Sequence, residues 1–356
     1  MKIFFFTTAK IHQVLKSILQ KITLTCFAST FAVMLLGQDI HFSQSHFSPL
    51  NLSPGLAGMF SEDVRMIGSY RSQWQSVPVP FLTFSGAADM KLPNLMQGND
   101  KLSLAGGVHF NYDQAGDAQL SLSSFGVTGA LHYKINEMNI LSLGVQSVAS
   151  QRSFSINGLR FNNQFDGDVY SSSNDSKENF SNKNKAFVDL NAGLSWMLKN
   201  EDNRSHAIAG IGAYHLTGSV QSFKDDPDSQ LPMRFSIYSG GVIQVHPKWD
   251  IVIHVLGQLQ GPYQQILVGG AARYHLSEAR GKEIAVQMGT SFRIGDAVIP
   301  TFELHYAAWK IGVSYDVNIS SFEAATNGNG GIEIGAMYTI TNVKECVKVI
   351  ESCPVF

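Results

Sequence analysis

Residues 188–198 of the chain read VDLNAGLSWML, and this stretch shows the pattern that decides the fold. Apolar and polar positions alternate along it, with Leu190, Leu194, Trp196 and Leu198 on one side and Asp189, Asn191, Gly193 and Ser195 on the other. Successive side chains of a β-strand point to opposite faces of the sheet. The stretch therefore predicts a strand with one apolar and one polar face.

The same alternation recurs along most of the chain, for example in residues 101–113 (KLSLAGGVHFNYD) and 332–340. The runs predict about fourteen strands, at residues 62–73, 79–91, 101–113, 118–134, 138–150, 185–198, 205–217, 232–246, 249–258, 264–276, 282–294, 298–306, 309–319 and 330–341. Bacterial outer-membrane barrels have an even number of strands, as this prediction does. The least distinct turn is Ala307-Ala308, where merging two runs would change the number.

Alternation alone is also typical of a soluble sandwich with one buried face. Two features favour a barrel in lipid. The runs approach the 9–11 residues that a tilted membrane strand needs, and Tyr and Trp residues gather near run ends, as they do at membrane interfaces. The sequence therefore predicts an all-β protein, a transmembrane antiparallel up-and-down β-barrel in the outer membrane.

The connections between runs differ in length in a regular way. The long polar or Gly-rich connections are the fifth, seventh and thirteenth, at residues 151–184, 218–231 and 320–329, whereas short turns at residues 136–137, 246–248 and 276–281 are even-numbered. Alternate connections lie at the same end of a barrel. If the first strand begins in the periplasm, the long loops all face outside, which is the arrangement of bacterial barrels.

The composition agrees with a membrane barrel. The 356 residues are 44% hydrophobic and only 15% charged, with 32 glycines and a mean hydropathy of -0.00. A soluble domain usually has about 25% charged residues. Lipid-facing and lumen-facing residues average out in a barrel, which explains low charge without the high hydropathy of a helical bundle.

Residues 1–37 are predicted to be a signal peptide. Four lysines and no acidic residue lie in this region, whose apolar core at residues 22–36 contains Cys26 and is followed by Gly37. A retained membrane anchor is the alternative, which the short apolar core disfavours. Without residues 1–37 the chain has 22 basic and 28 acidic residues. This balance gives no reason to expect nucleic-acid binding.

Three further parts follow the predicted signal. Residues 38–61 fit no strand pattern and are interpreted as a plug in the lumen, a segment at the periplasmic rim or a site that recruits a partner; residues 62–341 form the predicted barrel; residues 342–356 form a tail. The tail contains Cys346 and Cys353. An exported protein can form a disulfide between them, although two unpaired thiols fit the sequence equally.

The sequence favours no enzyme. It has no His-Glu-x-x-His, Gly-x-Ser-x-Gly, phosphate-binding loop or Cys-x-x-Cys motif. His109, His132, His275 and His305 fall on polar strand faces, where an ordinary wet lumen with paired charges is a simpler interpretation than a catalytic or ion-selective one. Acidic clusters at residues 166–168 and 225–228 could hold calcium, but solvated turns explain them better. We therefore expect no catalytic residue, cofactor or metal.

Short motifs at both ends of the chain carry a family resemblance. They are Gln38-Asp39, Phe42-Ser43-Gln44, Pro49-Leu50, Ser53-Pro54 with Ala57-Gly58, Tyr70-Arg71-Ser72-Gln73-Trp74, and the C-terminal Cys353-Pro354-Val355-Phe356. On these residues the chain resembles the PorP/SprF family of outer-membrane proteins, which is associated with type IX secretion and gliding motility in Bacteroidota. The chain has Ser53 and Ser72 where the family usually has Asn.

The resemblance implies a non-enzymatic barrel that supports export or surface display of cargo proteins, such as adhesins with C-terminal sorting domains, together with components of the type IX secretion machinery. From the residues alone, a passive porin-like channel or a hydrophobic-solute transporter remains the alternative. The residues proposed for positioning the N-terminal segment or contacting a partner are Phe42, Gln44, Pro49, Pro54, Gly58, Tyr70, Arg71 and Trp74. A purely structural role for these residues fits equally well.

Overall fold

The structure is a computed structural model. It describes residues 39–74, 80–92, 101–116, 118–156, 159–171, 173–178, 182–224, 226, 229–279, 281–320 and 323–341. The predicted signal peptide, Cys346 and Cys353 lie outside these ranges. The compact unit that contains the strands begins at Ile40.

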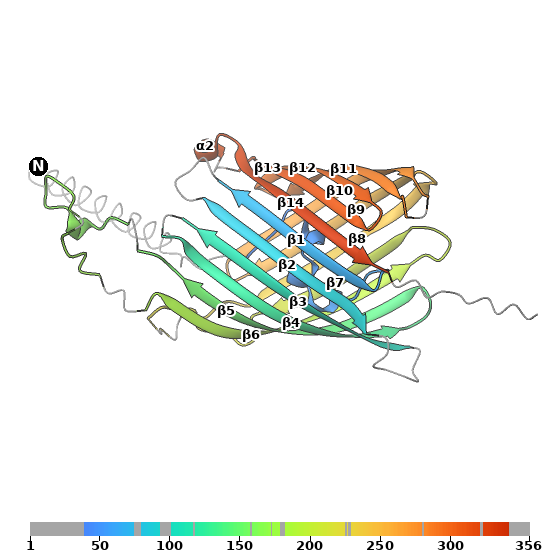
Figure 1. The fold of residues 1–356 in the computed structure, drawn as a ribbon, viewed down its shortest axis with the longest axis horizontal. Coiled ribbons are helices and arrows are strands. Elements are labelled where there is room, and N and C mark those ends of the chain that lie inside the picture. Colours follow the sequence, from blue (N-terminus) through green and yellow to red (C-terminus); the bar gives the residue numbers. More distant parts are fainter. Residues whose placement is uncertain are drawn as a thin grey trace, which may run out of the picture. The chain divides into compact units, whose positions relative to one another are not determined.

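The described residues form a closed barrel of fourteen antiparallel strands (Figure 1). The strands are β1 Val64–Gln73, β2 Phe81–Leu92, β3 Leu102–Ala115, β4 Leu120–Lys134, β5 Asn139–Ser153, β6 Asn184–Lys199, β7 His206–Tyr214, β8 Arg234–His246, β9 Trp249–Gln260, β10 Tyr263–Ser277, β11 Ile284–Arg293, β12 Ala297–Tyr306, β13 Trp309–Asn318 and β14 Asn329–Ile340. Each strand pairs with its neighbours in sequence, and β1 pairs with β14 to close the barrel, from Val64↔Ile340 to Gln73↔Gly331. The predicted fold is confirmed.

The two faces of the wall have opposite character. On β6, Val188, Leu190 and Leu194 are exposed on the outer face, whereas Asp189 and Asn191 are buried inside. This arrangement reverses that of a soluble protein, and it is the arrangement that lipid requires of a barrel. Within the described ranges, no helix has both the length and the apolarity to cross a membrane.

The ends of the barrel differ in loop length, as predicted. Short turns connect β4 to β5, β8 to β9 and β12 to β13 at the end where β1 begins; the last of these is the turn at Ala307-Ala308, with Tyr306 paired to Trp309. The long connections before β6, before β8 and before β14 lie at the opposite end, where the last of them contains the short helix α2, Glu323–Thr326. By the loop rule, the end with short turns is the inner, periplasmic end and the other is the outer end.

Several strands are shorter than predicted, and β7 is shortened most. The alternation predicts a run to residue 217, but β7 ends at Tyr214. His215 has a positive φ of 60°, and its backbone N–H donates to Asn191 Oδ1 at 2.9 Å, outside the strand ladder. A side chain on the neighbouring strand therefore replaces the regular pairing.

The segment before β1 lies within the barrel, where Figure 1 shows it in dark blue behind the strands. It contains three 3-10 helices, η1 Ser45–Phe47, η2 Pro49–Asn51 and η3 Pro54–Leu56. Proline begins η2 and η3, where its missing N–H costs no hydrogen bond, and the Ser53 hydroxyl caps η3 by accepting from Gly55 N at 3.2 Å. Helix η1 contacts β1 and β14, and η3 contacts β4 to β7. We call residues 40–61 the plug.

Candidate functional site

The plug runs through the lumen from the outer end to the inner end. Near its start, the Ile40 carbonyl accepts a hydrogen bond at 3.4 Å from Arg234, the first residue of β8 at the outer end. Near its end, the Leu56 carbonyl accepts one at 3.2 Å from Arg65, close to the start of β1 at the inner end. The chain then turns back into the wall.

A buried set of charges, the outer lock, holds the start of the plug. The Glu333 carboxylate accepts from the backbone N–H groups of Ser43 and Gln44, each at 2.7 Å and each on a separate oxygen. Arg71 is the register partner of Glu333 across the β1–β14 seam, with its Nε 3.7 Å from Glu333 Oε2. Hydrogen bonds to a charged group inside a protein are among the strong ones.

Asp316 completes the outer lock on the neighbouring strand. It lies 2.6 Å from Arg71 Nη2 and 3.0 Å from Arg293 Nη1. The Ser43 hydroxyl donates to Asp316 at 2.7 Å and accepts from Arg293 at 2.6 Å. Two arginines thus face two carboxylates, all of them buried. Removing any one of the four would leave an uncompensated buried charge.

The wall also supplies donors to the carbonyl groups of the plug. Tyr214 Oη donates to the Leu50 carbonyl at 3.0 Å, and Ser69 Oγ donates to the Phe47 carbonyl at 2.9 Å. A segment without a strand or long helix cannot satisfy its own backbone, so these side chains complete its hydrogen bonding. The plug is therefore matched to this particular wall along its length.

Glycines let the plug approach the wall closely. A Cβ atom at Gly144 would lie 2.3 Å from the Pro54 carbonyl, and one at Gly335 would lie 2.4 Å from the Phe47 ring. Such separations leave no room for any other residue at these positions. The wall glycines are thus part of the plug-binding surface.

An inner lock holds the end of the plug. Arg65 forms a bidentate pair with Asp89, at 3.0 and 2.7 Å, and the same carboxylate accepts from Gly58 N at 2.8 Å. The His132 ring donates to the Ala57 carbonyl at 2.8 Å. Gly58 has a φ of 71°, a conformation that favours glycine. The plug is therefore fixed by charge at both ends.

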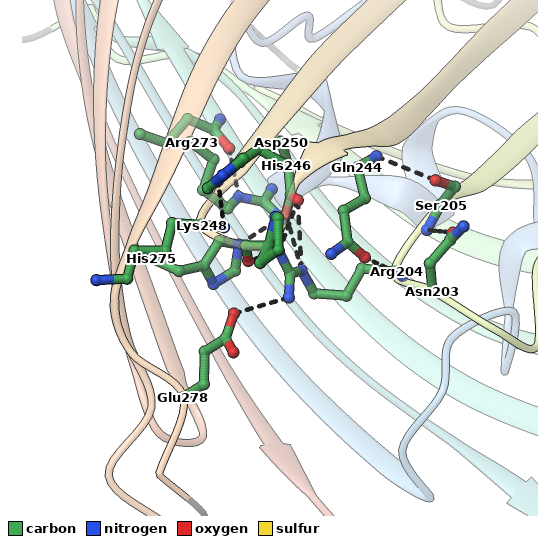
Figure 2. Close-up of polar contacts among 12 residues, drawn as sticks. Asn203, Arg204, Ser205, Gln244, His246, Lys248, Asp250, Arg273, His275 and Glu278 are labelled. Atoms are coloured by element: carbon green, nitrogen blue, oxygen red, sulfur yellow. Dashed lines mark hydrogen bonds and ion pairs between the residues drawn. The ribbon is translucent and has the colours of Figure 1, made fainter.

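A separate group of polar residues, the rim clamp, joins three turns at the inner end (Figure 2). Arg204, in the turn before β7, lies 3.0 Å from Asp250 on β9 and 2.9 Å from Glu278, which follows β10. It also donates to the Pro247 carbonyl at 2.6 Å. His275 contacts Asp250 at 2.7 Å on the other side. These contacts join the turns of the rim to one another, and none of the residues named here belongs to the plug.

Most of the motif residues named from the sequence belong to the plug or its binding surface. Phe42, Gln44, Pro49, Pro54 and Gly58 are buried plug residues, and Arg71 is part of the outer lock. Trp74 directly follows β1 with a φ of 52°, and its ring contacts Phe81 edge-on at 5.2 Å. Tyr70 instead faces outward and is exposed.

Sequence reasoning missed Glu333 and Asp89 as functional residues. Each is an acidic residue on the inward face of a strand, and each faces an arginine in the paired strand, Arg71 and Arg65 respectively. An inward carboxylate opposite an inward arginine is the signal that could have identified them.

The loop candidates for calcium have local explanations where they are described. Asp166 Oδ1 accepts from the backbone N–H groups of Val169 and Asp168, at 2.9 and 3.0 Å, and these bonds hold the pKa of the Asp166 carboxyl below its ordinary value. Of the second cluster only Asp226 is described. In the described part of the chain, no group of three or more His, Cys, Asp or Glu residues is placed to hold a metal ion.

An apolar outer face, short inner turns, long outer loops and a charge-locked plug define an outer-membrane β-barrel whose lumen is occupied by its own N-terminal segment. The family model described as "Type IX secretion system membrane protein PorP/SprF" matches residues 35–338. The chain belongs to this family, which confirms the resemblance drawn from its motifs and places it in the outer membrane with type IX secretion. Comparison with curated proteins gives no match.

Solved structures with similar folds are outer-membrane barrels. The Pseudomonas putida toluene transporter TodX is 8% identical with a TM-score of 0.49, covering 85% of this chain and 95% of its own. The Ralstonia pickettii toluene transporter TbuX is 9% identical with a TM-score of 0.46, covering 81% and 92%. A Pseudomonas aeruginosa FadL homologue is 11% identical with a TM-score of 0.46 and the same coverage. The likeness concerns the fold alone.

Proposed function

We propose that the protein is a non-enzymatic barrel that supports the export or surface display of cargo proteins by the type IX secretion machinery, with adhesins that carry C-terminal sorting domains as the expected cargo. The observation that carries the proposal is the charge-locked plug. A barrel whose lumen holds a wall-bound segment of its own chain is expected to act through its outer loops, its rims or its wall. Family membership supplies the secretion context.

The polar groups of the lumen support a non-catalytic role. The His132 ring is hydrogen-bonded to the Ala57 carbonyl. The Glu333 and Asp316 carboxylates accept hydrogen bonds from Ser43 and form ion pairs with two arginines. Catalytic acids, bases and nucleophiles must reach a substrate. These groups face the plug instead.

A passive channel or hydrophobic-solute transporter is less well supported. A conducting barrel needs a continuous aqueous path, whereas the plug binds the wall from Ile40 near the outer end to Leu56 near the inner end. Moving the plug aside in each transport cycle would break its hydrogen bonds to Glu333, Asp316 and Asp89.

The test is mass spectrometry of surface and secreted proteins from a strain that lacks the protein, beside its parent. The proposal expects selective loss of one or a few large proteins with C-terminal sorting domains. A surface and secreted proteome identical to that of the parent would refute it. If solute uptake changed at the same time, the channel hypothesis would take its place.

A further inference from the structure

The barrel wall has one seam at which a long strand lies beside a short one. Strand β6 begins at Asn184, but its pairing with β7 begins at Ala192, so its first eight residues pair with β5 alone. The next largest offset at the outer end of the described barrel is four residues, between Tyr263 and Leu267 on β10. The unpaired length at the start of β6 is therefore twice the next largest one at this end of the described barrel.

The chain that leaves β7 covers only part of this seam. Leu216 N donates to the Leu190 carbonyl at 3.0 Å, outside the regular ladder. The Ser219 hydroxyl then donates to the Val188 carbonyl at 2.6 Å, and the Thr217 hydroxyl lies 3.4 Å from the same carbonyl. The Thr217 hydroxyl donates to Asp189 at 2.6 Å, and the Ser219 hydroxyl lies 3.0 Å from that carboxylate. Side chains thus cover the edge as far as Val188.

Beyond Val188 the covering chain turns away. The Ser219 carbonyl accepts from Leu231 N at 3.0 Å, and Val220 bridges Gln230, so residues 219–221 pair with residues 229–231 as the two sides of an arm. The backbone groups of the arm are hydrogen-bonded within the arm. They therefore do not pair with the next residues of β6. The covering of β6 by backbone and hydroxyl groups therefore ends at Val188.

The next backbone groups on this side of β6 belong to Ala186 and Asn184. The carbonyls of Leu190 and Val188 point toward β7, and alternate residues of a strand direct their backbone groups to the same side, so Ala186 and Asn184 point there too. In the described part of the chain, neither residue has a hydrogen-bond partner on that side. Their N–H and C=O groups form an open strand edge.

This edge lies at the outer end of the barrel. Val188 and Leu190 are exposed on the lipid-facing side of β6, while Ala186 and Asn184, farther toward the outer loops, are small and polar respectively. A row of unpaired N–H and C=O groups is a template for another strand. Extended segments add to such edges through main-chain hydrogen bonds.

We propose that the edge at Asn184 and Ala186 is a docking site at which an extended segment of a secreted partner protein adds one strand beside β6. The proposal rests on the proposed function, because it places the partner among the secreted proteins. An added strand needs a width of only about 4.8 Å beside β6. A second copy of the barrel is a poorer fit, because it would bring its own curved wall and its own paired residues 219–221 and 229–231 against the same edge.

The decisive variant is Ala186→Pro. Proline removes the N–H that faces the open side and leaves the pairing with β5 intact, because odd-numbered residues of β6 make that ladder. Ala186→Val is the matched control, since it changes the side chain and keeps the N–H. The readout is the surface amount of those proteins that a deletion strain loses, with barrel folding checked by heat-modifiable migration in gels.

We expect Ala186→Pro to lower this surface amount about tenfold or more, because it removes one strand-edge hydrogen bond and its ring obstructs an added strand. The Ala186→Val variant keeps the N–H and should stay near the parent level. Parent-level display by a folded Ala186→Pro barrel would overturn the docking site while leaving the proposed function intact. If the deletion strain loses no surface protein, the proposed function fails, and the docking site fails with it.

A photo-crosslinking amino acid at position 186 gives a second measurement that does not depend on the proline variant folding. A cross-link to one of the proteins lost from the deletion strain supports the docking site. A cross-link to a second copy of the barrel, or to lipid alone, overturns it.

Discussion

Replacing Glu333 by glutamine tests whether the outer lock holds the plug. Glutamine has nearly the same shape, but one of its two terminal groups donates and cannot accept. Of the two backbone N–H groups now bound at 2.7 Å, those of Ser43 and Gln44, one loses its acceptor. The substitution also removes one of the two carboxylates that face Arg71 and Arg293.

The expected loss follows from these contacts. A hydrogen bond to a charged group contributes about 1.5–3 kcal/mol, and a buried donor left without a partner adds a desolvation penalty of about 1–3 kcal/mol. We expect local release of the plug to become easier by about 3 kcal/mol, which is a factor of about 150 in the opening equilibrium at 1.4 kcal/mol for each tenfold change.

Amide hydrogen exchange of the purified barrel in detergent measures this equilibrium. Exchange in a peptide that contains Ser43 and Gln44 should accelerate by about two orders of magnitude, while peptides from the β5–β6 ladder stay protected. Glu278→Gln is the matched control, because it removes a half-exposed carboxylate of the rim clamp, where a surface pair contributes about 0–1 kcal/mol. Exchange at Ser43 and Gln44 within about threefold of the parent in Glu333→Gln would refute the lock.

Three further predictions concern the plug. Deleting residues 40–59 should raise single-barrel conductance in planar bilayers by about tenfold or more, since fourteen strands enclose more space than wall side chains fill; parent-level conductance would contradict this. Gly144→Ala should lower the free energy of unfolding by about 1–3 kcal/mol, because its Cβ would meet the plug backbone at 2.3 Å. Gly129→Ala is the control and should leave the free energy of unfolding unchanged, because the space around Gly129 is open. Arg65→Met should lower the free energy of unfolding by about 3–5 kcal/mol, because it leaves Asp89 buried without its charge partner. Urea unfolding in detergent measures this loss, and a loss below about 1 kcal/mol would contradict the prediction.

The sequence predicts the wall because the wall is a local pattern repeated. Val188, Leu190 and Leu194 are apolar at a period of two, and a strand facing lipid on one side needs nothing else to be recognised. The end of β7 could not be predicted in the same way. The residues after Tyr214 continue the alternation, and the ladder ends where His215 N bonds to the Asn191 side chain on the neighbouring strand β6.

The plug contacts lie beyond sequence reasoning for a related reason. Ser43 and Glu333 are separated by 290 positions, and nothing near either residue specifies the other. What the sequence does show is that residues 38–61 lack a strand pattern while containing two prolines, Pro49 and Pro54. Proline predicts where the segment turns; the donors and carboxylates that bind it become visible only when the barrel closes.

The outer lock also links the plug to barrel closure. Arg71 and Glu333 face each other across the β1–β14 pairing, which is the last pairing that the order of strands along the chain allows. The same Glu333 binds the plug backbone, so closing the wall and seating the plug use one set of buried charges. A segment that had to leave the lumen in each working cycle would strip Glu333 and Asp316 of their hydrogen bonds from Ser43 and Gln44 each time, at a cost of several kcal/mol. The plug therefore behaves as part of the wall, and the surfaces left for function are the loops, the rims and the open edge of β6.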